Sequence, residues 1–164
     1  MTPFSFEELQ KILELKPDEI DIDLLIFNST LFYVENLLGY QLADKNYNEL
    51  QTVKDCKVYT EQDHISEMIN IIDMTTKLSI THCVIDGRRI IFFNPKLEGH
   101  TVFLNYNAGF TEETFPADLK EVIVKLFLLK KKDFIRTQNH EEETGFEIPA
   151  DIQNIIHIYG RKCL

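Results

Sequence analysis

The stretch from residue 101 to 136 constrains the fold most, because it predicts a strand, a sharp turn and a long helix in succession. Residues 101–106 have the composition of a strand, and Gly109 supplies a turn after them. The helix predicted over 116–136 begins with Pro116, a residue whose missing N–H costs nothing at a first helical position. A strand that leads into a long helix favours an α+β fold.

The composition predicts one folded domain. The chain has 164 residues, 44% of them hydrophobic, including 12 Phe, which is enough to bury roughly two-thirds of the unfolded surface. No apolar run approaches the roughly 20 residues of a membrane span, so we expect no membrane partner. The first eight residues contain no Lys or Arg, so we expect no signal peptide.

The charge of the chain is acidic and uneven. The net charge is −10, with 5 Lys/Arg against 14 Asp/Glu in residues 1–70 and 12 against 13 in residues 71–164. An acidic chain repels the phosphate backbone, which disfavours a nucleic-acid-binding protein. DNA could still pass close to such a surface without binding it.

Two helices are predicted before residue 40. Ser5 and Glu8 fit a capping box for the first helix. The second opens at Asp18 or Asp21, runs to about Leu38 and is stopped by Gly39. Its apolar residues cover more than one face, which is typical of a helix packed on several sides. This favours a central position, or a helix shared between the core and a partner subunit.

The middle of the chain predicts strands and loops. Residues 79–85 and 89–93 form a hairpin through Asp86-Gly87, and 101–106 complete a three-stranded antiparallel meander. Residues 43–76 are interpreted as a long connection with possible strand pieces around 53–59 and 68–72. The expected class is therefore α+β, a mainly helical domain of about four helices with a small meander.

Basic residues gather at the far end of the long helix, where they complement the helix dipole. This lysine cluster comprises Lys125, Lys130, Lys131, Lys132 and Arg136. It fits a solvated helix end, a docking patch for the acidic face of a neighbouring subunit, or a direct DNA contact. The acidic first 70 residues would supply such a face, so head-to-tail self-association is electrostatically plausible.

The C-terminal region predicts a division of the chain into residues 1–136 and 137–164. Residues 137–147 are a polar, acidic linker, and a short apolar helix follows Pro149. The helix either folds back on the core or forms a mobile arm that inserts into a groove of a partner.

No pattern of reactive side chains is present. The five histidines do not form a close pair, and the three cysteines have neither zinc nor disulfide spacing. No phosphate-binding glycine loop occurs. Asp118 and Glu121 are explained by their place at a helix start. The sequence therefore predicts no enzyme, no metal site and no cofactor.

Several segments, in the right order, resemble one family. They are Phe6-Glu7-Glu8-Leu9, Leu24 to Gly39, Tyr106-x-Ala108-Gly109, Phe115 to Lys120, and Ile148 to Arg161. Together they are similar to the head–tail connector proteins, also called head-completion or adaptor proteins, of long-tailed phages and prophages.

The resemblance implies a mechanical role without catalysis. Such a chain, made in the bacterial host cytoplasm and monomeric alone, forms a ring, dodecameric on the portal, in the neck of the virion. The ring extends the channel for viral DNA, without sequence-specific binding, and contacts the next neck protein (the head stopper) or a tail component. The lysine cluster is then a subunit interface. Portal binding is implied for Ile148, Pro149, Ile152, Ile155, Ile156, Tyr159 and Arg161.

Three other functions remain open from the residues. One is another neck or tail-completion protein. The second is a small cytoplasmic hydrolase, which a metal-dependent activity would reveal. The third is an acidic regulatory module, which tight binding to a basic DNA-binding protein would reveal.

Overall fold

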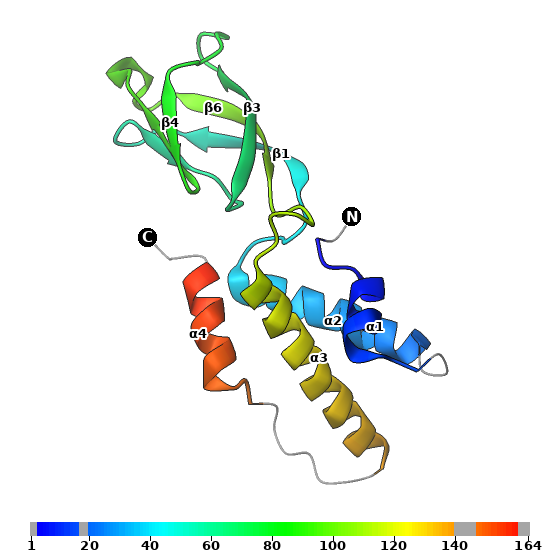
Figure 1. The fold of residues 1–164 in the computed structure, drawn as a ribbon. Helices are drawn as coiled ribbons and strands as arrows, with labels where there is room; N and C mark the ends of the chain where they lie inside the picture. The colour runs from blue at the N-terminus through cyan, green and yellow to red at the C-terminus, as the bar shows by residue number, and fades with distance from the viewer. Residues whose placement is uncertain (1–2, 17–19, 140–146, 161–164) are drawn as a thin grey trace. The chain divides into compact units, whose positions relative to one another are not determined.

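The chain divides into two compact units in the computed structural model, which describes residues 3–16, 20–139 and 147–160 (Figure 1). The β unit comprises residues 40–111, and the helical unit comprises residues 3–39 together with those from 112 onward. The β unit is thus inserted into the sequence of the helical unit. The predicted α+β class is confirmed.

The helical unit has four α-helices within the described residues: α1 (Phe6–Leu13), α2 (Ile20–Leu38), α3 (Ala117–Gln138) and α4 (Ala150–Tyr159). The cap at Ser5 is confirmed, since its hydroxyl accepts a hydrogen bond from the Glu8 N–H at 3.2 Å. Gly39, at φ 79°, ends α2 as predicted. Pro116 is the N-cap of α3 rather than its first helical residue. No helix in these described ranges combines the length and apolar character that a membrane span requires.

The core of the helical unit forms where α2, α3 and α4 pack together. Each helix contributes side chains from one face. A fully buried Val, Leu, Ile or Phe side chain stabilises the fold by about 1.5–3 kcal/mol. The buried apolar residues of the unit are Phe4, Leu9, Ile26, Phe27, Leu31, Val34, Leu38, Phe115, Leu119, Val122, Ile123, Leu126, Phe127, Ile152 and Ile156.

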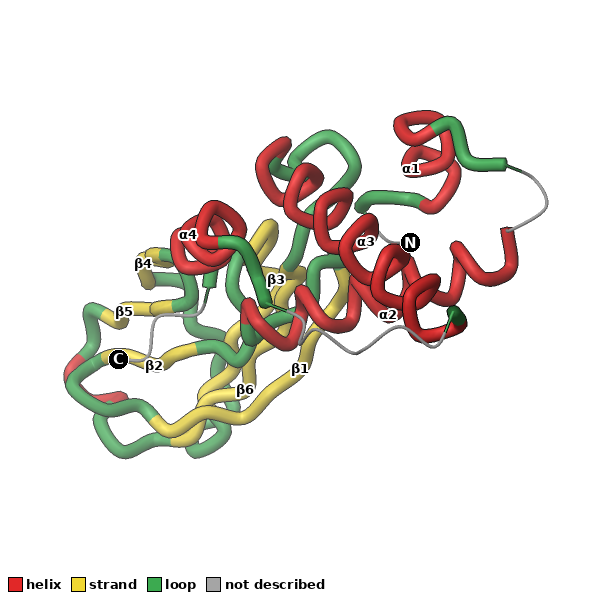
Figure 2. The backbone as a smooth tube through the Cα atoms, turned by 90° about the horizontal axis from the view of Figure 1, so that it is seen from below, coloured by secondary structure: helices red, strands yellow, loops and turns green. Residues whose placement is uncertain are grey.

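The β unit has two antiparallel sheets of three strands each among the described residues (Figure 2). The first sheet has the order β1-β6-β3, and the second has the order β2-β5-β4. The elements are β1 (Lys45–Thr52), β2 (Lys57–Tyr59), β3 (Ile65–Asp73), β4 (Cys83–Asp86), β5 (Arg89–Phe92), the short 3-10 helix η2 (Pro95–Leu97) and β6 (Thr101–Ala108).

The predicted hairpin is correct, but the predicted meander is not. β4 and β5 pair through the Asp86-Gly87 turn. β6, in contrast, lies in the other sheet, where it pairs with β1 and β3. The turn at Pro95–Leu97 separates β5 from β6 in sequence, so the two strands are not hairpin neighbours.

The interpretation of residues 43–76 as a long connection is wrong, because they supply β1, β2 and β3. The possible strand pieces around 53–59 and 68–72 do coincide with β2 and with part of β3. β1 escapes sequence analysis since its core-side positions include Glu49 and Gln51 rather than an apolar series. Glu49 is useful there because it accepts hydrogen bonds from the Tyr106 hydroxyl at 2.7 Å and from the Glu61 N–H at 3.1 Å.

The central strand β6 organises the core of the β unit. Its buried side chains alternate with half-buried ones, as expected for a strand with one covered face. Tyr106 is fully buried, and its ring stacks on Tyr47 with centroids 5.8 Å apart. The buried cluster contains Val53, Val58, Ile71, Ile90, Phe92, Leu97, Val102, Leu104, Tyr106 and Ala108.

The two ends of the β unit are tied together directly after β6. The Phe110 N–H donates to the Leu42 carbonyl at 2.8 Å, and the Asp44 N–H donates to the Phe110 carbonyl at 3.1 Å. Gly109 makes this approach possible, with φ at 115° and with space for no side chain. A Cβ there would lie 2.4 Å from the Ala43 carbonyl oxygen.

Candidate interaction surfaces

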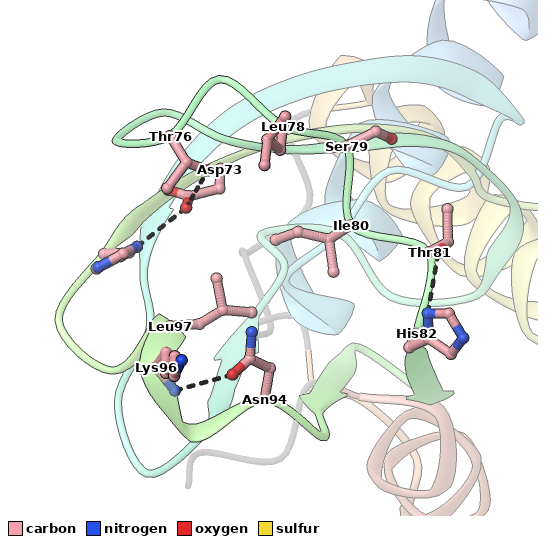
Figure 3. A pocket seen from close by; sticks show the side chains of 11 residues that line it. Asp73, Thr76, Leu78, Ser79, Ile80, Thr81, His82, Asn94, Lys96 and Leu97 are labelled. Atoms are coloured by element: carbon pink, nitrogen blue, oxygen red, sulfur yellow. Dashed lines mark hydrogen bonds and ion pairs between the residues drawn. The ribbon is translucent and has the colours of Figure 1, made fainter.

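A pocket of about 340 Å³ lies in the β unit, between the turn after β3 and the segment around η2 (Figure 3). Polar and apolar side chains both line it: Asp73, Thr76, Leu78, Ser79, Ile80, Thr81, His82, Asn94, Lys96, Leu97 and His100. Within the described ranges, no group of three or more His, Cys, Asp or Glu side chains is placed to hold a metal ion.

Asp73 is the buried acid of this pocket, and its oxygens are already engaged. The Thr76 hydroxyl donates to Oδ2 at 2.6 Å, the Thr75 N–H donates to Oδ1 at 2.9 Å, and His100 Nδ1 lies 3.0 Å from Oδ2. The hydrogen bond from Thr76 contributes most to lowering the pKa of Asp73 from 3.8 to about 2. The carboxylate therefore stabilises the turn after β3 through these hydrogen bonds.

The predicted anchoring helix, α4, packs on α2 and α3. Ile152 and Ile156 are buried there, while Ile155 and Tyr159 are half-buried. Ile148 is half-buried, and Pro149 is exposed. Arg161 lies outside the described residues.

Two polar contacts accompany this packing. The Tyr159 hydroxyl donates to the carboxylate of Asp118, 3.0 Å from each oxygen, and Lys125 Nζ donates to Asp151 Oδ2 at 2.7 Å. Burial, followed by the Asp118 contact, raises the pKa of Tyr159. The hydrogen bond from Lys125 lowers the pKa of Asp151. This arrangement corresponds to the folded-back position of the C-terminal helix, and binding to a portal stays a prediction.

The lysine cluster contacts the other helices of its own unit. Besides Asp151, Lys125 pairs with Glu121 at 2.7 Å. Lys130 Nζ donates to the carbonyl and hydroxyl oxygens of Ser29 at 3.0 and 3.1 Å, and it lies 4.7 Å from the ring centroid of Tyr33. Burial lowers the pKa of Lys130.

Lys131 forms the most deeply buried ion pair of the helical unit's described part. Its Nζ lies 2.9 Å from Oδ1 and 3.0 Å from Oδ2 of Asp23, a fully buried carboxylate, and it donates a hydrogen bond to Oδ2. Oδ1 has the ammonium charge beside it but no hydrogen bond. The pair links α2 to α3.

The outer end of the cluster differs from the rest. Lys132 is exposed and forms no ion pair with another described residue. Arg136 is half-buried. A subunit contact through the cluster therefore stays a prediction, and Lys132 is the member best exposed for it.

Two of the helices, α2 and α3, each carry several exposed apolar side chains. On α2, Leu25 and Phe32 are 69% and 66% exposed, and on α3, Leu128 and Ile135 are 46% and 47% exposed. The sequence predicts the α2 residues, because the apolar pattern of that helix covers more than one face. Groups of exposed apolar side chains are typical of interaction sites.

The sequence interpretation misses Asp23 and Asp73. A signal for Asp23 exists, since it interrupts an apolar helix that contains no Lys or Arg. A buried acid at such a place requires a cation from elsewhere in the chain. Asp73 lies in a stretch interpreted as a connection, so its burial has no comparable signal.

The sequence matches no model of a protein family, and no curated protein matches it either. Solved structures do match. The neck of an empty GTA particle, computed with C6 symmetry, has a TM-score of 0.64 at 13% identity and covers 96% of this chain and 89% of that chain. The neck of a native GTA particle, computed with C12 symmetry, has a TM-score of 0.64 at 12% identity and covers 99% and 91%.

This chain shares its fold with chains of these two structures. A third match, the virion of a native gene transfer agent (GTA) particle, has a TM-score of 0.60 at 13% identity and covers 89% of this chain and 80% of that chain. The coverage shows that the shared fold includes both the β unit and the helical unit. It agrees with the connector resemblance carried by the sequence segments.

Proposed function

We propose that this chain is a structural subunit of a head–tail connector, in the neck of a phage or phage-like virion. Copies of the chain form a ring that docks under the portal, extends the DNA channel and allows the tail to attach. The observation that carries the proposal is the fold match to a neck with C12 symmetry, which spans 99% of this chain. The proposed role involves no catalysed reaction.

The charge of the chain supports this role. A net charge of −10 makes a poor binding surface for phosphates, so DNA can move past the ring without being retained. The ring then contacts DNA only in passing and without sequence specificity. Its protein partners are the portal on one side and the next neck protein (the head stopper) or a tail component on the other.

Portal binding is assigned in this proposal to the C-terminal segment. Its residues are Ile148, Pro149, Ile152, Ile155, Ile156, Tyr159 and Arg161. The two buried isoleucines of α4 together stabilise its position on α2 and α3 by about 3–6 kcal/mol. A groove on the portal must bind α4 with at least this free energy to displace it from α2 and α3, so α4 is released only on the portal. In free subunits α4 therefore stays on α2 and α3.

An in-frame deletion of the gene in its parent phage tests the proposal, with the particles examined by electron microscopy. We expect heads without tails, which are either filled with DNA or leak it, beside complete separate tails. Restoring the wild-type gene on a plasmid should restore tailed particles. Normal tailed particles from the deletion strain would remove the chain from the neck.

A second position within the neck is also supported, because the matched structures are whole necks. The chain could be another neck or tail-completion protein that binds the tail end. Binding of the purified chain to purified portal and to purified tails separates the two. A connector binds the portal, whereas a tail-completion protein binds the tail alone.

A further inference from the structure

One side of α2 carries an exposed stripe with an acidic border. Asp21, Leu25, Asn28 and Phe32 follow one another at intervals of four, three and four residues, so they share a helix face. All four are exposed. The remaining charges of α2 are Asp23 and Glu35, and the helix contains no Lys or Arg. The α2 stripe thus holds two apolar side chains, with Asn28 between them and Asp21 at its start, on a helix whose charged residues are all acidic.

One side of α3 carries a second exposed stripe, with basic surroundings. Leu128, Lys132 and Ile135 share a face with the half-buried Val124, opposite the buried residues of α3. Between residues 125 and 136 the helix has five Lys/Arg and one Asp. The α3 stripe therefore holds Leu128 and Ile135 with Lys132 between them, and it lies on a basic stretch.

The two stripes match in size and differ in charge. Leu25 and Phe32 are seven residues apart, as are Leu128 and Ile135, so each pair of apolar side chains spans about 10 Å along its helix. The buried pair of Asp23 and Lys131 neutralises one charge on each helix. Asp21, at the start of the α2 stripe, and Lys132, within the α3 stripe, form no ion pair within the part of the chain that the structure describes.

We propose that the α2 stripe of one copy packs on the α3 stripe of the next copy. This inference rests on the proposed ring and names its subunit contact. Two α2 stripes would bring acid against acid, and two α3 stripes would bring base against base, so the charges disfavour a symmetric dimer. A contact between two different patches repeats from copy to copy, which is what a closed ring requires.

Two double variants test the contact, each with one stripe removed. The first carries Leu25→Asp and Phe32→Asp, and the second carries Leu128→Asp and Ile135→Asp. All four side chains are exposed, and circular dichroism with a thermal melt checks that each variant folds. Sedimentation of the full chain up to several hundred micromolar measures association, which we expect each variant to weaken at least tenfold relative to wild type.

Mixing the variants distinguishes this contact from other arrangements. The first variant keeps its α3 stripe, and the second keeps its α2 stripe, so an equimolar mixture should form dimers with one copy of each and nothing larger. Leu50→Asp in β1, an equally exposed position outside both stripes, should associate like wild type. Where wild type associates, a mixture that stays monomeric, or a single variant that associates like wild type, overturns the proposal.

A weak contact is captured by placing a photoreactive phenylalanine at position 25 in ¹⁴N chains mixed with ¹⁵N chains. We expect mixed-isotope crosslinks to residues 124–135. Crosslinks to α2 of the other copy, or no crosslinks between copies, contradict the proposal. The gene deletion described above is independent of these results. Tailless heads combined with failed crosslinking would refute the stripe contact alone, and normal particles would refute the connector role.

Discussion

Gly109 gives a physical meaning to the Tyr-x-Ala-Gly segment on which the sequence resemblance partly rests. Tyr106 and Ala108 are buried because they lie on the core side of β6. Gly109 follows them at the one point where the chain passes against the backbone of Ala43. The segment therefore reports how the β unit closes, rather than a reactive site.

Replacing Gly109 with Ala should destabilise the protein by about 3 kcal/mol or more, because a positive φ and an overlap with the Ala43 backbone occur together. Gly99→Ala is the matched control. Gly99 also has a positive φ, 77°, but a Cβ there meets nothing within 4 Å, so we expect a loss of about 1–2 kcal/mol. Urea unfolding of both variants measures the difference, and equal losses would contradict the argument.

Asp73 should make the stability of the β unit depend on pH in the acid range. Its pKa in the folded state, about 2, lies below its ordinary value of 3.8. The charged carboxylate therefore stabilises the fold fully above about pH 4, and this contribution is lost as the pH falls toward 2. Unfolding free energies of wild type and Asp73→Asn should differ most at neutral pH and converge below pH 4. A difference that is constant over this range would argue against the assigned role.

The helices and the β4–β5 hairpin were predictable from the sequence, whereas β1 and the pairing partners of β6 were not. Ser5, Gly39 and Pro116 mark helix ends through local backbone chemistry, which short sequence windows contain. The pairing of β1 with β6 depends on residues about sixty positions apart, and the core-side Glu49 hides the apolar alternation that would reveal β1. Local patterns carry no information on such pairings.

The same limit applies to the candidate surfaces. The sequence identifies the lysine cluster as a group, but only the fold separates Lys131, which is paired with Asp23, from the exposed Lys132. The multi-sided apolar character of α2 was visible in advance. Which of its residues remain exposed depends on the positions of α3 and α4.

Removing the buried cation should weaken the α2–α3 packing. Lys131→Ala leaves Asp23 buried without its partner, and we expect a loss of about 3 kcal/mol in unfolding free energy. Lys132→Ala, on the next residue, should change the stability by less than about 0.5 kcal/mol. Both variants are measured by urea unfolding at a concentration where the chain is monomeric. A similar loss in both would mean that the pair does not stabilise this packing.

Deleting residues 145–164 should remove α4 while leaving a folded core. Without α4, the surfaces of α2 and α3 that it covers lose the packing of Ile152 and Ile156. We therefore expect the unfolding free energy of the helical unit to fall by about 3–6 kcal/mol. Portal binding should be abolished at the same time. The full-length Leu50→Asp chain, which is changed only at an exposed position of β1, should retain it. Loss of the cooperative unfolding transition in the truncated chain would contradict a separable α4.

At the scale of the whole molecule, the β unit should fold without the helices. Residues 40–111 form a continuous segment with its own buried cluster, and backbone hydrogen bonds join its two ends. We expect the isolated fragment to give dispersed amide NMR signals and a cooperative thermal transition. The fragment with Gly109→Ala serves as the control and should melt at a lower temperature. A fragment without dispersed signals would mean that the β unit depends on the helices.

The tied ends of the β unit also bear on the order in which a newly made chain can fold. The end of α2 leaves the ribosome about eighty residues before the start of α3, and until α3 follows, α2 lacks the contacts that it makes with α3 in the folded chain. Once the β unit has folded, the joined ends shorten the effective loop between α2 and α3. Since each doubling of loop length costs about 0.6 kcal/mol in closure entropy, this favours the helix pairing by about 2 kcal/mol. Folding of the β unit thus favours the pairing of the helices that precede and follow it in the sequence.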